Sequence, residues 1–164
     1  MTYSATRRIL QRANDKLGTN WTLHDARHTL WLLPMTDALF DAVTAAGAPE
    51  LTGFWKAPAG YDRLLTACSE TGPVAYIEAD YSGGVGTQTA QVWDGGKIAL
   101  GPLHLAEGEP SPTTGTPISQ ALRRLGATKG NHVDEFAAVG LGRHRDTDDW
   151  LSPRNRSSSD KHIT

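Results

Sequence analysis

The most regular alternation of hydrophobic and polar residues runs over residues 73–81 and predicts a strand. Residues 87–93 are rich in Thr, Val and Trp, which favour β-structure, and they predict the returning strand. Asp94-Gly95-Gly96 is typical of a tight hairpin turn and leads into a third strand over residues 97–100. These segments predict a three-stranded antiparallel meander. We expect the short apolar run at residues 30–33 to join it as a fourth strand.

Helical patterns lie on both sides of these strands along the chain. Apolar residues at helical spacing follow Thr36, which can cap a helix N-terminus, and Gly47 is the expected end of that helix. Pro117 suits the first turn of another helix, which Gly126 ends. Further helices are expected over residues 3–17, 61–69 and 134–139.

Two longer loops connect these elements. The first carries Phe54 and Trp55, which we expect to pack in the core, and the second covers residues 101–116 and contains three prolines. Strands grouped in the middle of the chain with helices around them predict an α+β fold. We therefore expect a single small domain with a three- to four-stranded antiparallel sheet and flanking helices, preceded by a helical N-terminal segment.

Charge is distributed unevenly along the 164 residues. Residues 1–28 carry five basic and two acidic side chains, a net charge of +3, whereas residues 29–151 carry eight basic and fifteen acidic ones, a net charge of −7. Residues 152–164 are polar without apolar periodicity, which predicts a disordered tail. We divide the chain into an N-terminal segment 1–29, an acidic α+β domain 30–151 and this tail.

Composition also excludes several classes of protein. No apolar run approaches the roughly 18 residues that a membrane-spanning helix needs, and no apolar stretch follows the basic N-terminus as in a secretory signal. The single cysteine, Cys68, cannot form an internal disulfide or a cysteine-rich zinc site, and we expect it to be a buried thiol. The chain is therefore expected to be cytoplasmic, with no membrane partner, no cofactor and no metal.

A distinctive motif runs from Thr19 to Thr29 and reads Thr-Asn-Trp-Thr-Leu-His-Asp-Ala-Arg-His-Thr. With the helix expected before it, this segment resembles a piece of a tyrosine recombinase of the phage integrase family, which carries a His-x-x-Arg box followed by His-Thr. His24 and Arg27 occupy the box positions, and Ala26 stands where the family usually has Leu. The resemblance implies that Arg27 would clamp a scissile phosphate and that His24 would assist proton transfer, roles that suit a guanidinium fork and an imidazole.

The rest of a recombinase catalytic set is missing from the sequence. The family's first Arg and its Lys should lie well upstream of His24, which only 23 residues precede. The nucleophilic Tyr should follow soon after Arg27, but the nearest downstream Tyr is Tyr61, and Trp150 stands in a late segment that resembles the family's ending. An active recombinase is therefore rejected. The alternative is an inactive remnant that contacts DNA through residues 1–29, with Arg7, Arg8, Arg12 and Arg27 as candidates.

The acidic domain contains two further segments of interest, residues 77–88 and 134–145. They resemble a small bacterial family without an assigned chemistry. The size, charge and layout of the domain are similar to those of small acidic immunity proteins of bacterial toxin systems. The resemblance implies a non-enzymatic binding protein, immunity- or antitoxin-like, and the net negative charge suits a basic protein partner.

Glu78 and Asp80 fall on one face of the expected strand, about 7 Å apart from the rise per residue. We expect this pair to form an acidic face that receives Lys or Arg from a partner, with Tyr76 and Trp93 as aromatic anchors. The late segment supplies two more candidates for partner binding, Arg143 and His144.

An enzymatic use of these residues is the third hypothesis, and it requires Glu78, Asp80 and His144 to converge in a pocket. The glycines at residues 83–86 are expected to form a hairpin turn rather than a phosphate loop, because a strand and not a helix follows them. A metal site is the weaker alternative for the late segment. The residues of suitable type there are His144, Asp146, Asp148 and Asp149.

Overall fold

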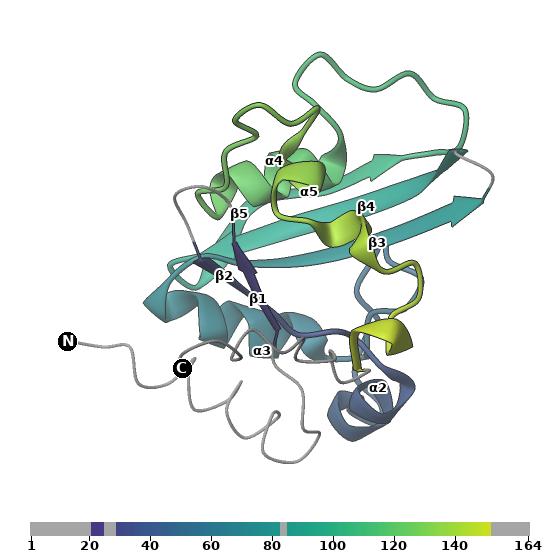
Figure 1. Cartoon of the computed structure of the whole chain (residues 1–164). Helices are drawn as coiled ribbons and strands as arrows, with labels where there is room; N and C mark the ends of the chain where they lie inside the picture. The colour runs from purple at the N-terminus through teal and green to yellow at the C-terminus, as the bar shows by residue number, and fades with distance from the viewer. Residues whose placement is uncertain (1–20, 25–28, 83–84, 152–164) are drawn as a thin grey trace, which may run out of the picture.

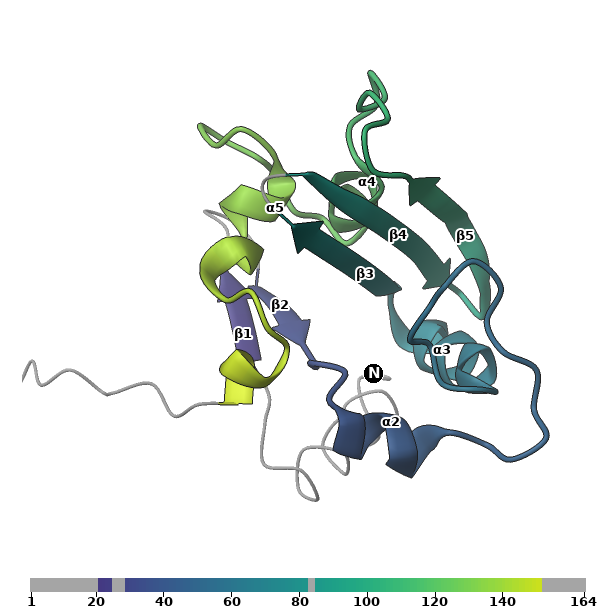
Figure 2. The same ribbon diagram turned by 90° about the vertical axis from the view of Figure 1, so that its right-hand side faces the viewer.

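The computed structural model describes residues 21–24, 29–82 and 85–151, which form a small α+β domain as predicted (Figure 1). Its centre is an antiparallel sheet in the order β3-β4-β5. Helix α3 covers one face of the sheet and α4 covers the other, with α5 beside α4 (Figures 1 and 2). The bounds are β3 (Val74–Ser82), β4 (Val85–Asp94), β5 (Lys97–Leu105), α3 (Tyr61–Cys68), α4 (Pro117–Arg124) and α5 (Glu135–Ala138).

The two hairpin turns of the meander lie where the sequence predicts them. Ser82 pairs with Val85, and the two glycines between them lie outside the described residues. Gly95 and Gly96 form the second turn with φ of 59° and 75°, the left-handed conformation that a type I′ turn requires. Their N–H groups donate to the carbonyl and the hydroxyl of Ser69, so this turn is fastened to the short 3-10 helix η1 (Ser69–Thr71).

Strand β5 continues to Leu105, which corrects the predicted loop from residue 101. Gly101 and Pro102 lie inside the strand, where sequence patterns associate them with turns. Gly101 has a φ of 91°, and a Cβ there would lie 2.6 Å from the Ala90 carbonyl oxygen. The pairing register also shifts on both sides of Val92, so a local irregularity lets the strand pass through these two residues.

The apolar run near Leu32 does not join this sheet, contrary to the prediction. Strand β2 (Thr29–Leu32) pairs with β1 (Trp21–His24) in a separate two-stranded antiparallel sheet. Leu30 and Leu32 pack against the core beside α4, so the hydrophobic run predicts burial correctly but not the pairing partner. The β1–β2 pairing also crosses the division that we placed between residues 29 and 30.

Helix α2 (Asp37–Val43) begins as predicted at Thr36, whose hydroxyl accepts the Leu39 N–H at 3.2 Å. It ends at Val43, four residues before the predicted end at Gly47. Helix α4 has Pro117 in its first turn and Thr116 as its cap. Both helix starts therefore follow from local capping chemistry.

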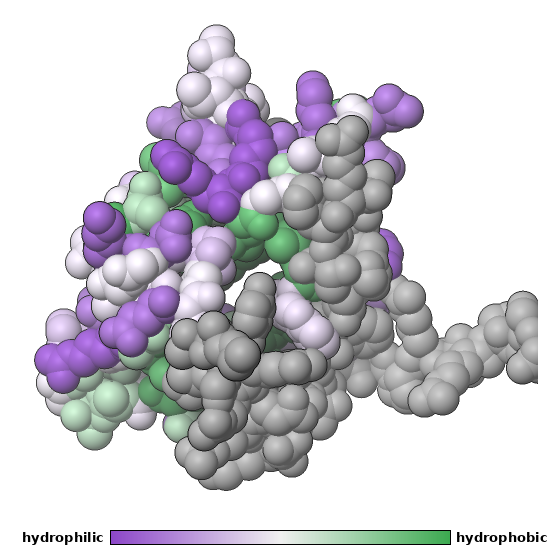
Figure 3. Space-filling view, turned by 90° about the vertical axis from the view of Figure 1, so that its left-hand side faces the viewer, coloured by the Kyte–Doolittle hydropathy of each residue, from purple (hydrophilic) through white to green (hydrophobic). Residues whose placement is uncertain are grey.

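Helix α5 is shorter than predicted and begins after Asp134, whose carboxylate accepts the Ala137 N–H at 2.8 Å. The 3-10 helices η2 (Leu141–Arg143) and η3 (Asp148–Leu151) follow it. In the described part of the chain no helix is both long and apolar enough to cross a membrane. Hydrophilic residues cover most of the described surface in Figure 3, with hydrophobic patches between them.

The two faces of β3 divide the core as the alternation predicts. Tyr76 packs toward α3, in a cluster with Tyr61, Leu65 and Trp93. Ile77 packs on the opposite face, toward α4. The cluster around α4 contains Ile118, Leu122, Ala127, Val139, Leu141 and Trp150.

Two isoleucines provide a matched test of this core. Ile118 of α4 is 0% exposed, whereas Ile98 of β5 is 55% exposed. Ile118→Ala should lower the free energy of unfolding by about 2–5 kcal/mol, because it leaves a cavity in the core. Ile98→Ala should change it by less than about 0.5 kcal/mol. Urea denaturation of both variants measures this, and equal effects would contradict the packing.

Candidate functional site

Glu78 lies buried on the face of β3 that meets α3, with only 8% of the residue exposed. Its two carboxylate oxygens accept the backbone N–H groups of Trp55 and Lys56, each at 2.8 Å. The hydroxyl of Tyr76 donates to the Lys56 carbonyl at 2.9 Å. These three bonds fasten residues 51–59, which we call the Trp55 loop, to strand β3.

Burial raises the pKa values of ionisable side chains in and around this site. It raises the pKa of Glu78, while the hydrogen bonds from the Trp55 and Lys56 amides act in the opposite direction. Burial also raises the pKa of Tyr76 far above its usual range and that of Tyr61 to about 12, so both phenols keep their protons. Both oxygens of Glu78 are engaged with the backbone of its own chain. We therefore assign Glu78 the role of an anchor for the Trp55 loop rather than of a general base.

The structure places three of the residues predicted to contact a partner inside the core. Glu78 and Tyr76 are each 8% exposed and Trp93 is 1% exposed, because α3 and the Trp55 loop cover their face of the sheet. A partner at the surface cannot reach them, and we do not retain that role for them. The alternation groups these side chains on one face but cannot show what covers that face. Asp80, two residues beyond Glu78, remains exposed.

Arg143 and His144 lie on the other side of the sheet, next to Trp150. The His144 and Trp150 rings are 4.7 Å apart between centroids, and the Arg143 guanidinium carbon lies 5.5 Å from the Trp150 ring centroid. Trp150 belongs to the core beside α4. His144 therefore does not converge with Glu78, and the enzymatic hypothesis loses the arrangement that it requires.

The metal hypothesis also gains no support from the described residues, which contain no group of three or more His, Cys, Asp or Glu side chains able to hold an ion. Cys68 is 5% exposed, as predicted for a buried thiol, and burial raises the pKa of that thiol. A thiol of this kind is a poor nucleophile, because the thiolate is the reactive form.

Strand pairing places Glu78, Thr89 and His104 in one row across the sheet, which the sequence spacing does not show. Thr89 Oγ1 lies 3.0 Å from His104 Nδ1, within hydrogen-bond distance. The row has the residue types of an acid, a hydroxyl and a base, but Thr89 is 0% exposed. A nucleophile must reach its substrate. Glu78 is already bonded to the Trp55 loop, so we interpret the contact with the exposed His104 as the hydrogen bond that satisfies the buried Thr89 hydroxyl.

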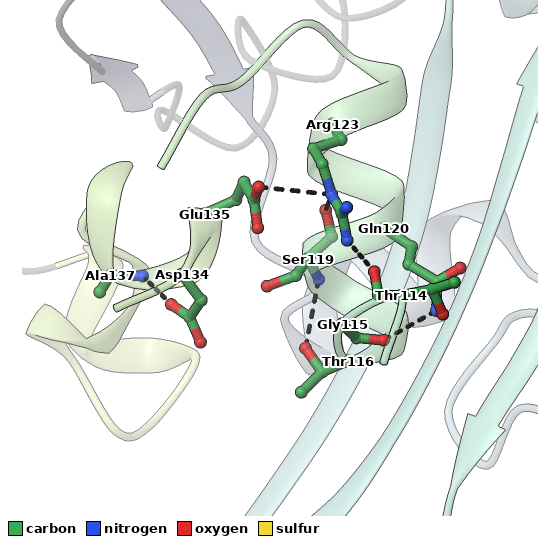
Figure 4. Close-up of polar contacts among 9 residues, drawn as sticks. All are labelled: Thr114, Gly115, Thr116, Ser119, Gln120, Arg123, Asp134, Glu135 and Ala137. Atoms are coloured by element: carbon green, nitrogen blue, oxygen red, sulfur yellow. Dashed lines mark hydrogen bonds and ion pairs between the residues drawn. The ribbon is translucent and has the colours of Figure 1, made fainter. Parts of the chain in front are cut away.

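A second polar cluster joins α4 to α5 and to the loop before α4 (Figure 4). Arg123 Nε lies 3.3 Å from Glu135 Oε1, and Arg123 Nη2 donates to the Thr114 carbonyl. Gln120 donates to the Gly115 carbonyl at 2.8 Å. Glu135 is 7% exposed. One guanidinium thus connects three segments, and we assign this cluster a structural role.

Trp55 is the candidate that sequence reasoning missed, since its hydrophobic character predicted packing. Its neighbour Phe54 does pack, with its ring centroid 5.3 Å from that of Tyr76, but Trp55 is 52% exposed. Lys56 Nζ lies 2.8 Å from Asp37 Oδ1, and this bond lowers the pKa of Asp37. The Trp55 surface, as we define it, consists of Trp55, Lys56 and Asp37.

Replacing Glu78 with Gln tests the anchor. One of the two acceptor oxygens becomes an NH₂ group, so the Trp55 or the Lys56 amide loses its partner. We expect the free energy of unfolding to fall by about 1–3 kcal/mol and hydrogen exchange at these two amides to accelerate. Glu70→Gln, at an exposed position, is the matched control and should change neither quantity. Unchanged exchange in Glu78→Gln would contradict the anchor.

The raised pKa of Glu78 also predicts the direction in which the free energy of unfolding changes with pH. The folded state holds the Glu78 proton more tightly than the unfolded state does. Its contribution to stability is therefore fully present below the ordinary pKa of 4.5 and declines as the pH rises through the folded pKa. The free energy of unfolding of the wild type minus that of Glu78→Gln should fall with pH in denaturation series from about pH 4 upward. A rise over that range would contradict the burial argument.

Comparison with known proteins assigns no role to the residues of this site. The recombinase-like segment lies largely outside the described residues, including Arg7, Arg8, Arg12 and Arg27, while His24 belongs to β1. Its DNA-binding role therefore stays a prediction, as does the similarity of the acidic domain to immunity proteins. No protein-family model, no curated protein and no solved structure matches the chain.

Proposed function

We propose that the acidic α+β domain is a non-enzymatic protein-binding module, immunity- or antitoxin-like, and that the Trp55 surface is its docking site. The observation that carries this proposal is the position of Trp55. The residue is 52% exposed, while its backbone N–H is bonded to the buried carboxylate of Glu78. A large aromatic side chain is thus presented to solvent by a loop whose backbone is fixed.

Such an arrangement suits protein recognition. Trp is among the residues that most often dominate the binding free energy of protein interfaces, because it buries a large area on contact. A loop that is already ordered loses little conformational entropy when a partner binds. The bonds to Glu78, the Tyr76 hydrogen bond and the Phe54–Tyr76 contact all supply this order before binding.

Charge favours a basic partner. Residues 29–151 have a net charge of −7, and the Trp55 surface includes the exposed carboxylate of Asp37. A negatively charged domain attracts a positively charged protein and accelerates its association at low ionic strength. The immunity-like character itself is supported by the size, charge and layout of the domain.

Two exposed tryptophans allow the docking site to be tested. The 164-residue chain is used to capture its partner, the partner is purified, and its Kd is measured by calorimetry. Trp55→Ala should raise the Kd by at least about thirtyfold, the loss expected for a central aromatic contact. Trp31→Ala, at a position 62% exposed on β2, is the control and should leave the Kd within about threefold. An unchanged Kd for Trp55→Ala would rule out this docking site.

A further inference from the structure

Lys56 forms an exposed ion pair on the Trp55 surface. Its ammonium lies 2.8 Å from Asp37, and the two side chains are 43% and 88% exposed. An ion pair exposed to this extent contributes little net stability, and water or another cation can take the place of the ammonium. The Lys56–Asp37 pair is therefore readily exchanged.

The backbone of Lys56 is held independently of this ion pair. Its N–H donates to Glu78 and its carbonyl accepts the Tyr76 hydroxyl. The ammonium can therefore leave Asp37 without releasing the Trp55 loop. Trp55 is the chain neighbour of Lys56, and Lys56 Nζ lies 2.8 Å from Asp37 Oδ1, so the exposed tryptophan borders the residue that engages this carboxylate.

An exposed tryptophan and an exposed carboxylate are each favourable for a cation. The ring face attracts a guanidinium or an ammonium, and the carboxylate adds a charge-assisted hydrogen bond. The protein already uses the first of these contacts internally, where the Arg143 guanidinium lies 5.5 Å from the centroid of the Trp150 ring. Lys56 supplies the ammonium that engages Asp37 in the free protein.

We propose that the Trp55 surface binds an Arg or Lys side chain of a basic protein partner, and that Lys56 competes with this side chain for Asp37. The inference rests on the proposed function, because it assigns chemistry to the same docking site. Lys56 then weakens the binding of the partner's cationic side chain. Removal of the Lys56 side chain therefore strengthens that binding.

The test uses the full-length protein and a short peptide of alternating Arg and Gly residues as the probe. Binding is followed by NMR from the indole N–H signal of Trp55, with the Trp31 signal as an internal control. We expect Lys56→Met to bind the probe about twofold to fivefold more tightly than the wild type, the range that an exposed ion pair allows. Asp37→Asn should bind it more weakly by a similar factor.

Lys97→Met is the matched control, since Lys97 is exposed at the start of β5 and its loss changes the net charge equally. An equal gain for Lys97→Met and Lys56→Met would overturn the competition and leave only a general charge effect. A peptide of alternating Glu and Gly residues should not shift the Trp55 signal, and an equal shift would overturn cation binding. Either of these results would overturn the inference about cation binding alone. The docking site itself is tested separately, by the Kd of Trp55→Ala for the purified partner.

Discussion

The buried carboxylate of Glu78 connects the core of this protein to the Trp55 surface. The two oxygens of Glu78 accept the backbone N–H groups of Trp55 and Lys56 at 2.8 Å, which holds the Trp55 loop against β3 at that point. A buried carboxylate is costly unless its oxygens are hydrogen-bonded. The two amides satisfy both oxygens of Glu78, and the position of the loop follows from that requirement.

This constraint separates what the loop buries from what it exposes. Phe54 turns inward onto Tyr76, while Trp55 is left half-exposed and Lys56 reaches Asp37 on α2. The exposed Trp55 thus belongs to a domain with a net negative charge. The docking surface that we propose consequently arises from a structural contact.

The sequence predicts the fold better than the site, and the reason is physical. Local rules give the meander, the turn at Gly95 and Gly96 and the caps at Thr36 and Thr116, because each depends on neighbouring residues. The alternation in β3 also predicts correctly which side chains share a face. It cannot predict that α3 and the Trp55 loop cover the face of Glu78, nor that β2 pairs with β1, because both depend on contacts between distant segments.

The hydrogen bonds to Glu78 require the Trp55 loop to be ordered before any partner binds. Backbone order parameters from ¹⁵N relaxation of the free 164-residue chain measure this order. The hydrogen bonds to Glu78 predict values of about 0.85 at Trp55 and Lys56, equal to those of strand β3. Values below about 0.6 at these two residues would show a flexible loop that Glu78 does not anchor.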